Sequence, residues 1–440
     1  MVGEGTQRLL GLARMKLLCN HEINEPYNLS TKGEALIAIL DVLLAFDFQP
    51  NCELNEDIQA KLVKSHMRIA YSIPQHCLYF QSGYPSEPLL AEAAAQQLLR
   101  FRGRDEGKSF GIMATMLSIT GLLKSTLIDA GQRGEVFMRM CLMGAYMEGV
   151  LQDIGSDGRH GIIFNKGCKL TTFIGQLFED GHAQRILDAR PNDNSTNTTF
   201  RQAFAQSMVR FTHFVKAGDP DMMTSEAMFA AFLRGMAFIG YQTQQAVDFA
   251  IPVLLNKEDT LQESAMSAIL IQVKRRVKGR GPGVYDLCQE DVDLFPPQGE
   301  GNADDRPYIT LIAQVGIELE EDTQNGIKTS TIRIPQQRMS VQHPKVHPQY
   351  AIIAYGCTGV YKYFDALKHK FLLATRDFSA DHPDYGVGGP RDLVMRLKPV
   401  WERSENSFHW LDRKPEEPKK RKEPEEPAKE LGKSKKPKSE

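Results

Sequence analysis

Two short apolar runs near the middle of the chain have the length and composition of β-strands, and polar residues separate them. Residues 247–255 are apolar except for Asp248, and residues 267–274 form the second run. Side chains alternate between the two faces of a strand. In the second run this alternation separates Ile269, Ile271 and Val273 from Leu270, Gln272 and Lys274. A strand that otherwise suits a core therefore ends with two polar side chains on one face.

Polar groups on such strands need partners, because burying an amide and an ammonium group beside an acid is costly unless they meet each other, a metal or a ligand. An acid on one strand and Gln-x-Lys on the next resembles the PD-(D/E)XK nuclease superfamily, in the variant where Gln replaces Glu. The resemblance implies that Asp248 and Gln272 position Mg²⁺ or Mn²⁺. It also implies that Lys274 orients the attacking water and stabilises charge on the phosphate. Carboxylate and amide oxygens suit such hard cations, and a bound metal acidifies water.

A further carboxylate lies in the segment before these strands. The apolar spacing of residues 224–238 predicts a helix, with Ser or Thr available as its N-cap. Members of the superfamily often carry an accessory Glu on the preceding helix, which makes Glu226 a candidate metal ligand. The simpler interpretation is that Glu226, as an acid in a first helical turn, only stabilises the helix dipole.

The central triad also has a structural interpretation. Asp248 and Lys274 could form an ordinary salt bridge, while Gln272 bonds to a neighbouring backbone group. The surroundings favour function, because the strand is followed at once by four basic residues: Arg275, Arg276, Lys278 and Arg280. Such a cluster can neutralise several phosphates, which is the sequence-independent part of nucleic-acid affinity.

The hydrophobic pattern elsewhere predicts helices first and a mixed set of elements later. Helical spacing occurs at residues 33–48, 86–101, 110–127, 134–151, 200–216 and 388–403, and strand-like runs at 307–318, 330–334 and 351–355. The polar stretch 190–199 reads as a domain boundary. We therefore expect an α+β or α/β protein. A helical region, residues 1–190, precedes a nuclease-like domain, residues 200–412, with a restriction-endonuclease-like mixed sheet flanked by helices.

The tail, residues 413–440, is rich in Lys, Glu and Pro, and we expect it to be disordered. Its run Lys419, Lys420, Arg421 and Lys422 resembles a nuclear-import signal, which implies an import receptor as partner and a nuclear location, with the cytoplasm as the alternative. A solubilising end is the simpler interpretation. The tail carries 11 basic and 7 acidic side chains, so a chain of net charge −2 leaves a body near −6. Electrostatic binding of nucleic acid is then confined to residues 274–280 and the tail.

Composition excludes several other classes. With 42% hydrophobic residues, the 440-residue chain can bury one large core or two ordinary ones. No apolar run is long enough to span a bilayer, so no membrane partner is expected. Seven scattered cysteines without a Cys-x-x-Cys pair argue against a disulfide scaffold and a structural zinc site. Motifs for phosphate loops, serine hydrolases, kinases and dinucleotide binders are missing.

Most of residues 80–400 is also similar to a set of uncharacterised fungal proteins. The shared segments are residues 83–88, 211–216, the Gln272–Lys274 strand and residues 355–357. This likeness brings no activity with it. Two hypotheses remain: a metal-dependent nuclease, and a non-catalytic nuclear interaction or scaffold protein that kept the fold. In the first, the polar residues must converge around one pocket; in the second, they can disperse. The sequence leaves the oligomeric state open.

Overall fold

The computed structural model describes residues 2–20, 33–48, 53–73, 80–101, 132–155, 161–192, 196–241, 246–258, 260–274, 287–296, 304–315, 331–335, 347–357 and 359–362. All of them belong to one compact unit, Met1–Phe378. The predicted helices 110–127 and 388–403, the basic cluster 275–280 and the tail 413–440 lie outside these residues.

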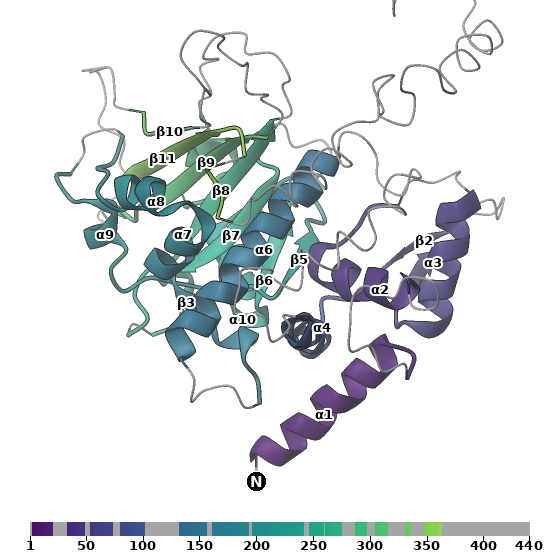
Figure 1. Ribbon diagram of the computed structural model, residues 1–440. Coiled ribbons are helices and arrows are strands. Elements are labelled where there is room, and N and C mark those ends of the chain that lie inside the picture. The colour runs from purple at the N-terminus through teal and green to yellow at the C-terminus, as the bar shows by residue number, and fades with distance from the viewer. Residues whose placement is uncertain are drawn as a thin grey trace, which may run out of the picture. The chain divides into compact units, whose positions relative to one another are not determined.

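A mixed sheet of nine strands organises the described part of the chain (Figure 1). Its strands run in the order β10-β11-β9-β8-β7-β4-β3, while β6 also pairs with β7 and β5 pairs with β6. Their bounds are β3 Cys168–Lys169, β4 Met208–Val209, β5 His213–Lys216, β6 Met236–Ile239, β7 Phe249–Leu254, β8 Met266–Lys274, β9 Tyr308–Gln314, β10 Thr331–Arg333 and β11 Gln349–Tyr355. A separate hairpin joins β1 (Ile69–Ser72) to β2 (Gln81–Gly83).

The central strands are buried on both faces, which explains their nearly continuous apolar sequences. β7 pairs with β8 in antiparallel fashion, while β8, β9 and β11 are parallel neighbours. Ile269 and Ile271 contribute to one apolar cluster, with Val273 packed against it, and Leu270 contributes to the other. The alternation predicted for residues 267–274 is therefore confirmed, and Gln272 follows Leu270 on its face.

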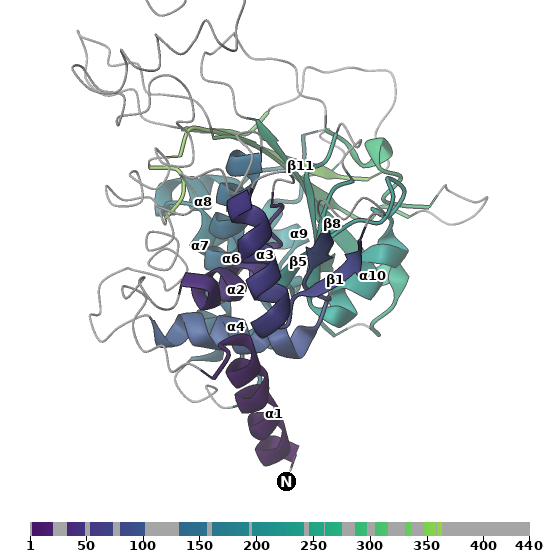
Figure 2. The same cartoon turned by 90° about the vertical axis from the view of Figure 1, so that its right-hand side faces the viewer.

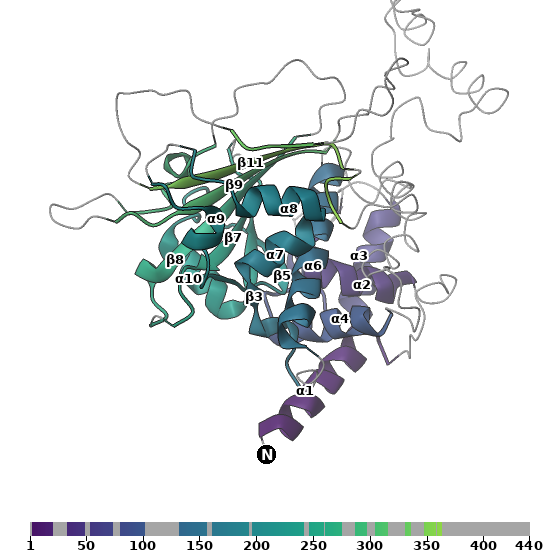
Figure 3. The same ribbon diagram turned by 60° about the vertical axis from the view of Figure 1, so that its left-hand side comes forward.

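Helices cover both faces of the sheet. The described helices are α1 Val2–Leu17, α2 Gly33–Leu44, α3 Glu53–Ser65, α4 Pro88–Arg100, α6 Gln132–Ile154, α7 Leu170–Leu177, α8 Asp180–Leu187, α9 Phe200–Ala203 and α10 Ser225–Arg234. Figure 3 brings α7 and α8 forward, on the side of the sheet that α6 also covers. α10 packs on β6, β7 and β8 from the opposite face, where Met228 and Phe232 join the second apolar cluster. The mixed α and β architecture with helices flanking a mixed sheet is as predicted.

The N-terminal elements are held to one another by a buried ion pair. Arg68, just before β1, donates to the carboxylate of Asp41 in α2, and both side chains are almost fully buried. The other Asp41 oxygen accepts the Phe46 N–H at 2.8 Å, directly after α2. Arg68 also donates to the Ser82 hydroxyl at 2.8 Å and to the Ser82 carbonyl at 2.7 Å, in β2. Figure 2 looks onto this side, where α2, β1 and β5 lie together.

Three helices predicted from apolar spacing end earlier than expected. The helix predicted over 33–48 ends at Leu44. The helix predicted over 224–238 ends at Arg234, because Gly235 adopts the left-handed conformation (φ 63°) that closes many helices, and the next four residues form β6. The helix predicted over 200–216 is wrong beyond Ala203. There the chain forms β4 and β5, since the aromatic and β-branched residues around Phe214 pair with β6 as a strand.

The predicted domain boundary at 190–199 does not separate two cores. β3, before this segment, pairs with β4 after it, and α6 contacts β8. One apolar cluster contains residues of α2, α6, β7 and β9. The helical region and the sheet therefore form one unit, in which residues 190–199 are a connection on the way to α9.

Candidate functional site

Five strand ends meet at one edge of the sheet. β5, β6, β8, β9 and β11 all run in the same direction, so their carboxyl ends lie together, and β7 runs the other way and begins there. The register places Lys216 beside Ile239, and Ile239 beside Phe249. Lys274 lies beside Gln314 on the other side of the sheet's centre. Ligands of open sheets with parallel strands commonly bind at such carboxyl ends.

Asp248 lies at this edge, immediately before β7. Its N–H donates to the Ile271 carbonyl at 2.8 Å, and its carboxylate accepts the Val273 N–H at 2.5 Å. Where the pairing of β7 with β8 ends, the Asp248 side chain thus replaces a backbone carbonyl as the acceptor of the Val273 N–H. Burial raises the pKa of Asp248, while the Val273 N–H and the charge of Lys274 act in the opposite direction. The raised pKa means that the ionised carboxylate is only partly compensated by its surroundings.

Gln272 and Lys274 lie in the last part of β8, and Asp248 contacts the backbone of this strand. Gln272 is 8% exposed, and Lys274, at the strand end, is partly exposed. Asp248 is bonded to the backbone of Ile271 and Val273, and the charge of Lys274 acts on it. Asp248 therefore lies against the end of the strand that carries Gln272 and Lys274.

Glu135 is electrostatically coupled to Asp248, and the sequence pattern gave no indication of it. It lies in the first turn of α6, about 110 residues before Asp248, and is half-buried. Burial raises its pKa to about 7, with a further contribution from the negative charge of Asp248; Arg139 and Lys216 act in the opposite direction. A carboxyl group that titrates near neutrality within electrostatic reach of a second carboxyl group is a recognised feature of functional sites.

Arg139, one turn after Glu135, fixes the position of α6 against α2. Its guanidinium donates to the carbonyls of Leu44 and Ala45, with the second bond at 2.8 Å, where α2 ends. Burial lowers the pKa of Arg139 to about 10, against the opposing effect of Glu135. The free carbonyls of a helix end are thus satisfied by a cation, which also suits the helix dipole.

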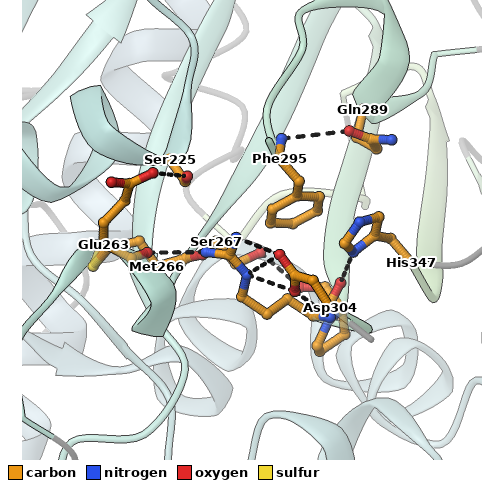
Figure 4. Close-up of polar contacts among 10 residues, drawn as sticks. Ser225, Glu263, Met266, Ser267, Gln289, Phe295, Asp304 and His347 are labelled. Atoms are coloured by element: carbon orange, nitrogen blue, oxygen red, sulfur yellow. Dashed lines mark hydrogen bonds and ion pairs between the residues drawn. The ribbon is translucent and has the colours of Figure 1, made fainter. Parts of the chain in front are cut away.

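Glu226, the predicted accessory ligand, lies at the other end of β8. Its neighbour Ser225 donates its N–H to Leu294 and its hydroxyl to the Glu263 carboxylate at 3.0 Å, just before β8 begins (Figure 4). Gln272 is six residues further along β8, or roughly 20 Å at the usual rise of a strand. Glu226 is exposed and is not brought to Asp248. The prediction fails because α10 crosses the sheet near the start of β8.

The end of the sheet near Glu226 is closed by a saturated polar network (Figure 4). Arg306 donates two hydrogen bonds to Asp304 Oδ2, at 2.6 and 3.0 Å, and further bonds to the Glu263 and Met266 carbonyls at 2.9 and 2.8 Å. Its guanidinium also lies 4.7 Å from the centre of the Phe295 ring. With its charge paired and its donors occupied, Arg306 serves to hold the loops at this end.

A cavity of about 200 Å³ opens beside the carboxyl-end site. It lies between the end of α2, the β1–β2 hairpin and β5. Aromatic side chains, among them Phe46, Tyr71 and Tyr84, line it together with the ion pair of Asp47 and Lys216. Lys216 and Asp47 both influence the pKa of Glu135, so the cavity and the carboxyl-end site are electrostatically continuous.

A Ser–His contact fixes the turn that borders this cavity. His213 Nε2 lies 3.0 Å from the Ser86 hydroxyl, and Arg234 donates to the Ser86 carbonyl. Burial, followed by the charge of Arg234, lowers the pKa of His213 to about 4, so its ring is neutral at physiological pH. Residues 83–88 and 211–216, two of the four segments singled out in the sequence, thus meet here. The other two, Gln272–Lys274 and residues 355–357, flank the end of β9.

The residues that the structure describes contain no group of three or more His, Cys, Asp and Glu side chains placed to hold a metal. Asp248 and Glu135 are two carboxylates, and Gln272 adds an amide oxygen. Mg²⁺ often takes only one or two protein carboxylates and completes its shell with water and phosphate oxygens. The oxygens of these side chains are of the kind that a hydrated magnesium ion accepts, whereas a closed structural site would need more of them. The nucleic-acid-binding candidates Arg275, Arg276, Lys278 and Arg280 lie outside the described residues.

Fold and site together define an α+β protein with a titratable polar site at the carboxyl edge of a mixed sheet. The chain belongs to the family described as "Domain of unknown function (DUF8736)", whose model matches residues 25–281. That match covers α2 to the end of β8, including Glu135, Asp248 and Lys274. No match to the chain is found among curated proteins or solved structures. Within the described segments, no helix has the length and apolar character needed to cross a membrane.

Proposed function

We propose that this protein is a metal-dependent nuclease that hydrolyses phosphodiester bonds of nucleic acid at the carboxyl edge of its sheet. The observation that carries the proposal is the hydrogen bond from the Val273 N–H to the Asp248 carboxylate, which holds the acid against the end of β8 and within electrostatic reach of Lys274. Gln272 lies on the same strand end. Glu135 adds a second acid from another element.

Mg²⁺ or Mn²⁺ would be held by Asp248 and Glu135, with the amide oxygen of Gln272 as a neutral donor. Bound there, the metal supplies an acidified water and positive charge for the phosphate. The raised pKa of both carboxyl groups supports this arrangement, because two acids that lack a full positive partner are the groups that a divalent cation would stabilise.

Lys274 would neutralise charge as it develops on the phosphate. Its charge already acts on Asp248, so its ammonium group lies within electrostatic reach of the proposed metal site. Glu135 has its role at the metal, whose charge would favour the ionised form of this carboxyl group. The chain's own residues thus offer ligands for a metal and a cation for the phosphate.

The test is cleavage of supercoiled DNA, single-stranded DNA and RNA by the full chain with Mg²⁺ or Mn²⁺. Asp248→Ala and Lys274→Ala are expected to lower the rate at least a hundredfold, since each removes a group from the reacting region. Glu226→Gln is the matched control, because that acid is exposed and lies at the far end of β8. Cleavage that survives both substitutions, or a folded wild-type protein that cuts none of the substrates, would exclude the proposal.

The second candidate is a non-catalytic interaction protein with the same fold. The observation in its favour is that Asp248 already has a structural task, capping the Val273 N–H, and that Gln272 is buried. In that case Asp248→Ala should lower stability, because it removes the acceptor of the Val273 N–H, without any loss of function. The basic run Lys419–Lys422 stays a prediction of nuclear import under either function, and the nucleus is the proposed location.

A further inference from the structure

The cavity next to the carboxyl-end site has the lining of a site for a flat aromatic group. Tyr71, in β1, is 64% exposed and forms part of the wall, and Tyr84 and Phe46 supply further rings. An engineered apolar cavity of about 150 Å³ can hold a benzene molecule. At about 200 Å³, this cavity has room for a somewhat larger planar ring.

Tyr84 lines the cavity, and its hydroxyl is closed to solvent. This hydroxyl makes no hydrogen bond in the described part of the chain. Burial raises the pKa of Tyr84 well above its usual value, so this hydroxyl stays protonated and can donate. A buried donor without an acceptor costs free energy, which an incoming acceptor would recover. The carbonyl oxygens and ring nitrogens of nucleobases are acceptors of this kind.

The mouth of the cavity carries charge on the side that faces the proposed catalytic residues. Lys216 lines the cavity, is about half exposed and pairs with Asp47. The register Lys216–Ile239–Phe249 puts Lys216 two strands away from the start of β7, or roughly 10 Å at the usual spacing of strands. That distance corresponds to between one and two nucleotides of an extended strand.

We infer that this cavity receives the unpaired base of a nucleotide adjoining the scissile phosphate, so that the substrate is single-stranded or locally unpaired nucleic acid. The inference rests on the proposed function and narrows its substrate class. The base stacks on the tyrosine rings, Tyr84 donates to it, and Lys216 contacts the neighbouring phosphate. Sites for single strands combine such aromatic platforms with a basic path for the backbone.

Gly83 keeps the Tyr71 ring in place. A Cβ atom added at Gly83 would lie 1.9 Å from the Tyr71 hydroxyl, so the tyrosine must move if this glycine is replaced. Because Tyr71 is largely exposed, it can move without disturbing the core. Gly83→Ala therefore alters the cavity wall while leaving the tyrosine in the chain.

The experiment measures binding of a fluorescent single-stranded DNA oligomer, the matching RNA oligomer and a blunt duplex, with Ca²⁺ in place of Mg²⁺ to limit cleavage. Tyr71→Ala and Gly83→Ala should weaken single-strand binding about tenfold. The matched control is Ile69→Ala, on the same strand and also exposed, which does not line the cavity. A 2-aminopurine base in the oligomer reports stacking directly, and its quenching should be lost in Tyr71→Ala.

Three outcomes separate this inference from the proposed function. Binding that depends on Tyr71 and Gly83 supports the cavity as a base site, even if the wild-type chain cuts nothing. Cleavage that requires Asp248 but is unchanged in Tyr71→Ala and Gly83→Ala, with equal binding by all variants, supports the nuclease and overturns the base site. Binding of duplex as tight as that of single strands, with no quenching of 2-aminopurine, also overturns it.

Discussion

Glu135 is the residue whose charge state should depend most directly on the site around it. Its pKa of about 7 lies above the usual 4.5 because the ionised form is buried beside Asp248. Between about pH 4.5 and pH 7 the unfolded chain loses this proton while the folded chain retains it. Stability should therefore fall as pH rises through that window, by about 3 kcal/mol at most.

Urea unfolding at pH 5 and pH 8 measures this effect. Glu135→Gln should remove most of this residue's contribution to the pH dependence and should stabilise the protein at pH 8, because Gln carries no charge to bury. Mg²⁺ should reduce the dependence in the wild type, since a cation favours the ionised form. An equal slope in wild type and Glu135→Gln would contradict the electrostatic description of this residue.

At the same scale, the sequence pointed to polar residues at the ends of two neighbouring strands. Asp248, Gln272 and Lys274 could be singled out because a polar residue in an apolar strand is conspicuous, and because strands alternate; the structure places Asp248 against the end of β8, and their joint role stays a prediction. Glu135 could not be singled out, since an acid in a first helical turn has an ordinary role there. What makes Glu135 unusual is its electrostatic coupling to Asp248, which depends on how α6 crosses the sheet. The sequence does not show this crossing, and it therefore favoured Glu226, which lies on the helix before the two strands.

At the level of elements, the end of α10 depends on Gly235. This residue has φ 63°, and a Cβ atom added to it would lie 2.2 Å from the Asn165 side-chain oxygen. Gly235→Ala should destabilise the protein by about 2 kcal/mol, since it combines a left-handed conformation with a clash. Chemical denaturation of the full chain measures the change.

Gly175, inside α7, is the matched control for this substitution. A Cβ atom there meets nothing within 4 Å, and its backbone is helical. Gly175→Ala should therefore stabilise the protein by about 0.5–1 kcal/mol, because alanine favours the helix. If Gly235→Ala and Gly175→Ala changed the free energy of unfolding in the same direction, the difference in backbone conformation would not explain their effects.

The type of an element could be predicted where burial on both faces determined its sequence pattern. The buried strands β7, β8, β9 and β11 have continuous apolar sequences, and the sequence predicted all four. The segment 200–216 was predicted as a helix because its aromatic residues recur at helical intervals. In the structure Phe200, Phe204, Phe211 and Phe214 do share one core, but they reach it from α9, from β5 and from the connection between them. Spacing alone could not distinguish one helix from a helix and a strand that pack on the same cluster.

At the scale of the whole molecule, the helical region cannot be separated from the sheet. α6 packs against β8 and α7. β3, which follows α6 in the chain, pairs with β4 and forms one edge of the sheet. A chain that begins at Thr199 would lose α6 and expose the apolar face formed by Phe249, Ile251 and Ile269. Exposing apolar surface costs about 25 cal/mol per Å². Summed over a whole face of the sheet, this cost exceeds the small net free energy of unfolding of an ordinary domain.

We therefore expect the fragment 199–362 to be unfolded or aggregated when expressed alone, and the fragment 2–362 to unfold in a single cooperative transition. Far- and near-ultraviolet circular dichroism of the two fragments, together with calorimetry, tests this directly. A folded 199–362 fragment with its own sharp transition would restore the two-domain organisation that the composition of residues 190–199 suggested. A single compact unit also means that Glu135 and Asp248 are held by the same cooperative structure, so the proposed site should be lost in one step, together with the fold.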